Sequence, residues 1–232
     1  VTHPIENPVE MNFHSDLAVK RIAQIKGYKA YFEKAFGDEK VSKDRINKAI
    51  ATFERMVVSH TSRFDKFVKG KKNELTDSEI NGLHLFRTKA NCINCHNSSY
   101  FSDQKFHNIG LTYFGRTLQD LGLYEITKKS EDVGKFKTPT LREITSTAPY
   151  MHNGLFPHTR GVINMYNAGM PTEKRDPNNP LSPKKSEMLV KLDLSESEID
   201  DLENFLKTLH SLNYKMRMPE LPSNKIKKEE AK

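Results

Sequence analysis

One five-residue motif constrains this 232-residue chain more than any other feature of its sequence. The only two cysteines lie in Cys92-Ile-Asn-Cys95-His96. Two thiols one helical turn apart can each form a thioether to a vinyl group on the same edge of a porphyrin. The adjacent histidine can then place its imidazole under the iron. The motif therefore predicts one covalently attached c-type haem, held by Cys92 and Cys95, with His96 as the proximal iron ligand.

Three other interpretations of this motif compete with haem attachment. A structural zinc site needs four ligands, and the sequence contains no second cysteine pair or His-x-His cluster to complete one. A thioredoxin-like redox pair expects a strand–helix–strand context, which the sequence lacks. A chance occurrence of so short a motif is the third alternative. A disulfide scaffold is excluded, because its cysteines would be spread along the chain. Haem attachment is the favoured interpretation.

Apolar residues recur at helical spacing through the first sixty residues. Ser15 is predicted to cap a helix that Gly27 ends, and a second helix is expected over 28–36. Ser42 is predicted to cap a third helix. The buried face of this third helix is expected to consist of Ile46, Ile50, Phe53 and Val57.

Two capping boxes predict where later helices begin. Thr76 pairs with Glu79, and Ser195 pairs with Glu198. The first of these helices is expected to run into the cysteine motif. The residues expected to be buried are Ile80, Leu83 and Phe86 in the first helix and Ile199, Leu202, Leu206 and Leu209 in the last. Because no run of alternating strand residues is found, the predicted fold class is all-α.

Two long irregular stretches, about 97–158 and 170–192, lie between the predicted helices. Loops of this length are uncommon in compact domains unless they surround something. A haem group is a large apolar object that could organise them, so a c-type cytochrome domain with long haem-wrapping loops is expected. The predicted organisation is a helical segment over 1–70, the cytochrome domain over 71–218 and a charged tail over 219–232.

Composition narrows the classes of partner. Hydrophobic residues make up 36% and charged residues 29% of the chain, and no stretch of about 18 apolar residues predicts a transmembrane segment. The net charge of +7 is spread over several segments. Such a distribution is typical of a solvated surface or of a surface that binds an acidic partner protein. Nucleic acid is not expected, because no recognition motif accompanies the lysines. No apolar leader follows Val1, so any signal peptide is expected to have been removed, unless the chain is an internal piece.

Several segments, in order along the chain, resemble the bacterial dihaem cytochrome c peroxidase family, which includes the MauG-type enzymes. Besides the cysteine motif, they are Pro4-Ile5-Glu6-Asn7-Pro8-Val9-Glu10-Met11, Phe106-His107-Asn108-Ile109-Gly110, Thr138-Pro139-Thr140-Leu141-Arg142 and Thr147-Ala148-Pro149-Tyr150-Met151-His152-Asn153-Gly154. The resemblance implies two lobes with one haem each. The Cys92–His96 haem matches the electron-transfer haem. A peroxidatic haem would belong to a lobe upstream of Val1, so the chain is expected to be the C-terminal portion of such an enzyme.

The resemblance also implies roles for single residues. Glu10 matches the acid placed over the peroxidatic haem, where it would move a proton between peroxide oxygens. Tyr166 matches the position of the sixth iron ligand, which is Met in the peroxidases and Tyr in MauG-like members. Met151, Met165 and Met170 are the alternative ligands within this chain. Tyr166 lies on the apolar face of a short predicted helix, whereas Met165 would project about 100° away from it.

Weaker expectations follow from the same resemblance. Thr147 and Pro149 match residues whose backbone carbonyls bind a structural Ca²⁺, while His107 and His152 match positions near the haem. The expected function is haem-dependent reduction of hydrogen peroxide. Electrons would come from a small donor protein (a cytochrome c or a cupredoxin), or the oxidised substrate would be a protein or a quinone. A stand-alone monohaem electron carrier is the alternative. A periplasmic location is expected, and since family members often form dimers, a homodimer is one expectation.

Overall fold

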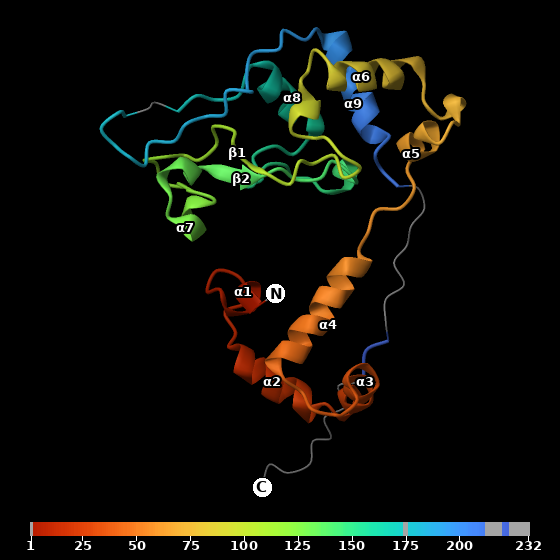
Figure 1. Ribbon diagram of the computed structural model, residues 1–232, viewed down its shortest axis with the longest axis vertical. Coiled ribbons are helices and arrows are strands. Elements are labelled where there is room, and N and C mark those ends of the chain that lie inside the picture. Colours follow the sequence, from red (N-terminus) through yellow and green to blue (C-terminus); the bar gives the residue numbers. More distant parts are fainter. Residues whose placement is uncertain (1, 174–175, 212–219, 223–232) are drawn as a thin grey trace. The chain divides into compact units, whose positions relative to one another are not determined.

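The computed structural model describes residues 2–173, 176–211 and 220–222. Its contacts divide the chain into two units, one formed by Val1–Val58 with Lys215–Lys232 and the other by Ser59–Tyr214. Figure 1 draws the first unit mainly in red and orange and the second in colours from orange to blue. The division predicted from the sequence (1–70, 71–218 and 219–232) stays a prediction, and residues 219 and 223–232 of the tail lie outside the described residues.

The first unit consists of helices joined by short turns: α1 (Thr2–Glu6), α2 (Ser15–Gln24), α3 (Lys26–Phe36) and α4 (Lys43–Met56). Ser42 caps α4 as predicted, because its side chain accepts a hydrogen bond from the Arg45 amide. Helix α3 ends at Gly37, which adopts the left-handed conformation that glycine tolerates best.

Two predictions at the ends of α2 are wrong. Ser15 is the first helical residue rather than the cap, because its buried hydroxyl donates to the Glu6 carboxylate instead of holding the helix end. Gly27 lies inside α3, and the chain bends at Ile25. A Cβ atom on Gly27 would lie 2.4 Å from Cβ of Pro222, so a close approach of two segments explains this glycine better than helix termination.

The predicted buried face of α4 is also wrong. Ile46 and Ile50 are half-buried, but Phe53 is 42% exposed and Val57, which follows the helix, is 59% exposed. The neighbouring Met56 is 62% exposed. The sequence pattern therefore identifies an apolar stripe correctly, while the described residues leave half of that stripe uncovered.

The second unit contains the remaining elements. The helices are α5 (Arg63–Val68), α6 (Asp77–Arg87), α7 (Tyr124–Thr127), α8 (Thr159–Asn167) and α9 (Glu196–Lys207). The single 3₁₀ turns are η1 (Lys72–Glu74), η2 (Cys92–Asn94), η3 (Ser130–Asp132) and η4 (Ile144–Ser146), and the strands are β1 (Phe106–Asn108) and β2 (Lys135–Lys137). Both predicted capping boxes are confirmed at the starts of α6 and α9.

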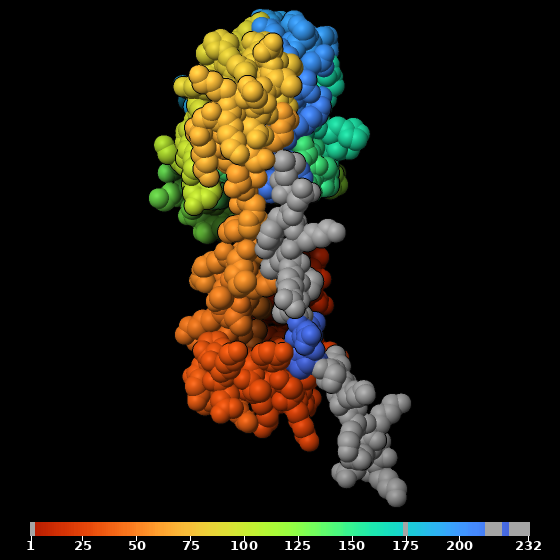
Figure 2. All heavy atoms as spheres, turned by 90° about the vertical axis from the view of Figure 1, so that its right-hand side faces the viewer, coloured from red at the N-terminus to blue at the C-terminus, as the bar shows by residue number. Residues whose placement is uncertain are grey.

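Helices α6 and α9 form the centre of the second unit, and Figure 2 shows them side by side in yellow and blue. The predicted α9 residues are all buried, together with Phe205. In α6, Phe86 is buried as predicted, but Ile80 is 40% exposed, and Leu85 occupies the core instead. Gly82 allows the helices to approach, since a Cβ atom there would lie 2.0 Å from the Asp201 carbonyl oxygen. Helix α6 ends at Arg87 and does not reach the cysteines.

The fold is mostly helical, and the prediction of no strands needs one correction. Strands β1 and β2 form an antiparallel pair in which His107 lies opposite Phe136. Each strand has three residues, too few for an alternating pattern to be recognised in the sequence.

The long predicted loops are largely confirmed. The stretch 97–158 contains β1, β2, α7 and the turns η3 and η4, while the described part of 170–192 contains neither helix nor strand. The two stretches contact each other, because the Ser186 amide donates to the Asn108 carbonyl at 2.9 Å.

A partly buried ion pair joins α5 to the segment before η4. The Arg142 guanidinium donates to both carboxylate oxygens of Asp65 at 3.0 and 2.9 Å. Partial burial acts to raise the pKa of Asp65, but hydrogen bonds from Arg142 and Ser62 outweigh it and hold this pKa at about 2.

This depressed pKa predicts an acid-dependent loss of stability. A carboxyl group whose pKa is lower in the folded state stabilises the fold above its unfolded pKa, near 4, and the contribution is lost as the pH falls toward 2. We expect this pair to contribute about 2 kcal/mol to the free energy of unfolding at neutral pH, falling away between pH 4 and 2. Urea unfolding of the wild type and of Asp65→Asn across this range would measure it. An equally steep decline in Asp65→Asn would contradict the assignment.

Candidate functional site

The two cysteines and His96 lie on one tight turn that follows the core helix α6 after a short connection. Asn91 adopts a left-handed conformation that lets the chain leave α6 and enter η2. The amides of Cys95 and His96 both donate to the Cys92 carbonyl, at 3.3 and 2.8 Å. Cys92 also packs against the α6–α9 core. The local sequence therefore folds into a single turn that presents both thiols and the imidazole together, as haem attachment requires.

Burial governs the state of the two thiols, neither of which forms a disulfide. It raises the pKa of Cys92 to about 12 and, with a smaller contribution from the Asp103 carboxylate, raises that of Cys95. Thiol–disulfide exchange needs a thiolate, so the surroundings of the motif disfavour the redox-pair alternative.

The imidazole of His96 is held in one orientation. Its Nδ1 lies 2.9 Å from the Phe101 carbonyl oxygen, and Nδ1–H is the natural donor to that acceptor. Burial lowers the pKa of His96, against the opposing effect of the Phe101 and Pro139 backbone. The ring is therefore neutral, with the Nε2 lone pair unengaged by this bond, which is the form that ligates a metal.

Tyr166 lies near both cysteines, on helix α8. Burial, followed by the neighbouring Cys92 and Cys95 thiols, raises the pKa of its phenol. Two hydrogen bonds hold the end of this helix, because the Asn167 side chain donates to the Leu194 carbonyl and accepts from the Leu194 amide, at 3.1 and 2.8 Å. The structure thus brings Tyr166 to the predicted haem-attachment turn.

The methionine alternatives occupy three different settings. Met165 is half-buried on α8, Met151 is half-buried at a left-handed position, and Met170 is buried just after α8. The choice among these and Tyr166 as iron ligand stays a prediction.

His107 lies beside the attachment turn through an aspartate that sequence reasoning missed. Its Nε2 is 2.7 Å from a carboxylate oxygen of Asp103, and the Asp103 amide donates to the Cys95 carbonyl at 2.7 Å. One donor atom each from Cys95, Asp103 and His107 lies within 4.8 Å of the others. Within the described ranges this group offers three metal-binding atoms, one fewer than a structural zinc site. The Asp–His spacing of four residues was the available signal.

His152 stacks on Phe136 of strand β2. Its ring lies 3.6 Å from that of Phe136, with 10° between the planes. Burial lowers the pKa of His152, and the Asp120 carboxylate opposes this effect. Phe136 pairs with His107 across strands β1 and β2, so the structure brings both predicted histidines to this two-stranded sheet.

The other predicted residues belong to other segments of the chain. Thr147 and Pro149 are in an exposed segment in which the Ala148–Pro149 peptide bond is cis. Glu10 belongs to the first unit, where it follows α1 with an exposed side chain and its amide donates to the Asn7 carbonyl.

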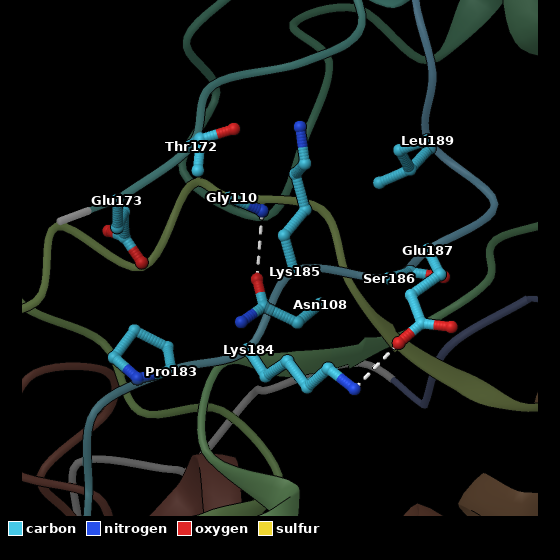
Figure 3. A pocket seen from close by; sticks show the side chains of 10 residues that line it. All are labelled: Asn108, Gly110, Thr172, Glu173, Pro183, Lys184, Lys185, Ser186, Glu187 and Leu189. Carbon is cyan, nitrogen blue, oxygen red and sulfur yellow. Dashed lines mark hydrogen bonds and ion pairs between the residues drawn. The ribbon is translucent and has the colours of Figure 1, made fainter. Parts of the chain in front are cut away.

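A cavity of about 290 Å³ lies where the two long loops meet (Figure 3). Asn108, Gly110 and Pro183 are among the residues that line it, and none of the predicted haem residues does. Lys185 extends from its wall and donates to the Gly169 and Met170 carbonyls beyond the end of α8. This cavity therefore lies beside the segment that follows α8, and it is distinct from the cysteine turn.

The cysteine turn predicts a specific pattern of haem retention. Cys92→Ala and Cys95→Ala should each leave one thioether, so the haem stays attached under denaturing conditions, whereas the double variant should release all of it. Acid–acetone extraction followed by mass measurement would distinguish these cases. Retention of haem by the double variant would contradict attachment at this turn.

Comparison with known proteins agrees with this geometry. Residues 1–73 match the di-haem cytochrome c peroxidase family, and residues 79–210 match the cytochrome c family. No helix among the described residues is long and apolar enough to cross a membrane.

Individual relatives carry both functional names. Cytochrome-c peroxidase IdrP1 of Pseudomonas sp. (strain SCT) is 34% identical, covering 88% of this chain and 59% of its own length. Methylamine utilization protein MauG of Methylophilus methylotrophus is 34% identical, covering 94% and 62%. A crystal structure of a MauG-like protein associated with microbial copper homeostasis is 34% identical with a TM-score of 0.78, covering 91% and 67%. This chain thus spans about 60% of the length of these curated relatives, and it belongs to the di-haem cytochrome c peroxidase and MauG family.

Proposed function

We propose that this chain is the electron-transfer portion of a dihaem cytochrome c peroxidase or MauG-like enzyme that reduces hydrogen peroxide. The observation that carries the proposal is a turn with two attachment thiols and an imidazole that is oriented by the Phe101 carbonyl and whose pKa is lowered by burial. Cys92 and Cys95 would hold one haem c, and His96 would be its proximal ligand. Bound there, the haem supplies one-electron chemistry, and the protein supplies the orientation of His96 and an apolar wall.

Tyr166 is proposed as the sixth ligand. Burial disfavours its phenolate, so an anionic ligand at this place needs a compensating positive charge, such as that of a ferric centre. A phenolate stabilises oxidised iron and lowers the reduction potential, whereas Met raises it. A Tyr ligand would therefore favour holding oxidising equivalents, as a MauG-like function requires.

Glu10 is proposed as the general acid–base at a second haem, carried elsewhere in the complete protein. Its side chain is exposed, and the flanking Val9 and Met11 are 89% and 66% exposed. Two large apolar side chains around an exposed carboxylate are unusual for a solvated turn and are typical of a surface that another structure covers.

The remaining assignments follow the family. Thr147 and Pro149 would offer backbone oxygens to Ca²⁺, which prefers oxygen ligands. The donor would be a small cytochrome c or cupredoxin, or the oxidised substrate a protein or quinone, and the enzyme would act in the periplasm, with a homodimer as a proposed state. A stand-alone monohaem carrier is the second candidate. The dihaem relatives and the Glu10 segment favour the enzyme, because a carrier has no use for a distal acid.

Exchange of the proposed ligand tests the haem assignment. Tyr166→Met should raise the reduction potential of this haem and replace the spectrum of a phenolate ligand with that of a thioether ligand. Met165→Leu, on the same helix, should change neither. Spectroelectrochemical titration of the three proteins would measure this. An unchanged potential in Tyr166→Met would remove Tyr166 from the iron.

Loss of the proposed acid tests the enzymatic function. In the complete protein from its native source, Glu10→Gln should reduce the rate of peroxide turnover by about 10² to 10⁴, the usual contribution of a general acid–base. Glu33→Gln, an exposed glutamate in the same unit, is the matched control. Equal turnover in the wild type and in Glu10→Gln would remove Glu10 from the proposed acid–base role. A native protein with one haem and no peroxide activity would favour the electron carrier.

A further inference from the structure

The segment Thr138–Arg142 matches the family, but the proposed function gives it no role. Its contacts lead to the loop that follows His96. The Thr138 carbonyl accepts a hydrogen bond from the buried Ser102 hydroxyl at 2.7 Å. The Thr140 hydroxyl donates to the Tyr100 carbonyl. This segment therefore holds consecutive residues of the loop directly beyond the haem-attachment turn.

Arg142 makes the strongest of these contacts. Its Nε donates to the Ser99 carbonyl at 2.7 Å, and its guanidinium carbon lies 5.7 Å from the centre of the Phe101 ring. Its other two nitrogens bind Asp65, whose position on α5 is fixed by a capping box with Ser62. With 16% of the Arg142 side chain exposed, solvent screens these contacts little.

The loop held by Arg142 supplies the partner of the proximal imidazole. Phe101 is 6% exposed, its backbone is left-handed, and its carbonyl accepts the His96 Nδ1 hydrogen bond at 2.9 Å. Its ring meets those of Phe64 and Phe86 edge-on, at 5.2 and 6.0 Å between centres. The phenylalanine rings hold the side chain of Phe101, and the Arg142 guanidinium holds the backbone of the same loop at Ser99.

We propose that Arg142 is a positioning residue for His96, holding the 99–101 turn so that the Phe101 carbonyl stays aligned with Nδ1–H. The inference rests on the proposed haem role of His96. A hydrogen bond at Nδ1 fixes the ring of a ligating histidine and increases the basicity of Nε2. The planar five-donor fork of arginine can bind a carboxylate with two nitrogens and a carbonyl with the third, which lysine cannot do.

The test replaces arginine with lysine at two comparable places. Arg142→Lys keeps the charge and loses the fork. Arg63→Lys is the matched control, because Arg63 also binds a carboxylate with two nitrogens, those of Glu79 at 2.6 and 2.8 Å, and also donates to the Glu74 carbonyl. Both variants should lower the melting temperature of the holoprotein. Arg142→Lys should in addition shift the ferric–ferrous equilibrium toward ferrous by roughly tenfold, the lower end for an outer-shell partner of a metal ligand, which is about 59 mV for one electron.

Reduction potentials and the g-values of the ferric haem would be measured for the wild type and both variants. A potential in Arg142→Lys that matches Arg63→Lys would overturn the inference. If Arg142→Lys does not accumulate, Asp65→Asn, which releases the guanidinium from its anchor, replaces it, and an unchanged potential there has the same meaning. An intact effect of Tyr166→Met beside an inert Arg142→Lys would overturn the role of Arg142 alone. Absence of covalent haem in the wild type would overturn the proposed function.

Discussion

The packing of α6 against α9 is the contact from which the rest of the second unit is built. Gly82 lets the two helices approach so closely that a single added methyl group would meet the backbone of Asp201. Around this contact, Phe86, Phe205 and Leu209 are essentially without solvent exposure. Interiors this dense resist small displacements. The cysteine turn follows α6 after a short connection, and Cys92 packs on the same core, so this core positions the proposed attachment point for the haem.

Burial also sets the chemistry of the site. The same apolar surroundings keep the Cys92 thiol protonated, the His96 ring neutral and the Tyr166 phenol uncharged. Low polarity disfavours the charged form of each group, so it raises the pKa of the thiol and of the phenol and lowers the pKa of the imidazole. A site in which each potential ligand is neutral carries little charge of its own. The reduction potential of an iron centre placed there would therefore depend more on its ligands and their hydrogen-bonding partners than on solvent.

The hydrogen bond between His96 and Phe101 links the fold to the proposed function. The loop carrying that carbonyl receives contacts from Thr138, Thr140 and Arg142, and the Arg142 side chain reaches α5 through Asp65. The Thr138–Arg142 motif, which the sequence identified without explaining, therefore contacts the loop that follows His96.

Features that depend on near neighbours in the chain could be predicted from the sequence alone. The capping boxes at Thr76 and Ser195 are confirmed, and Cys92, Cys95 and His96 lie on one turn, because each feature needs only a few consecutive residues. Predictions that depended on what covers a surface did less well, as the exposed Phe53 and Val57 show. Contacts between distant parts of the chain could be read only from the folded structure, which places Tyr166 near both cysteines and joins Asp65 through Arg142 to the loop at Ser99. The Arg142–Asp65 and Arg142–Ser99 contacts span 77 and 43 residues of sequence. No local pattern encodes a pairing over such a distance, because it exists only after the core has brought the segments together.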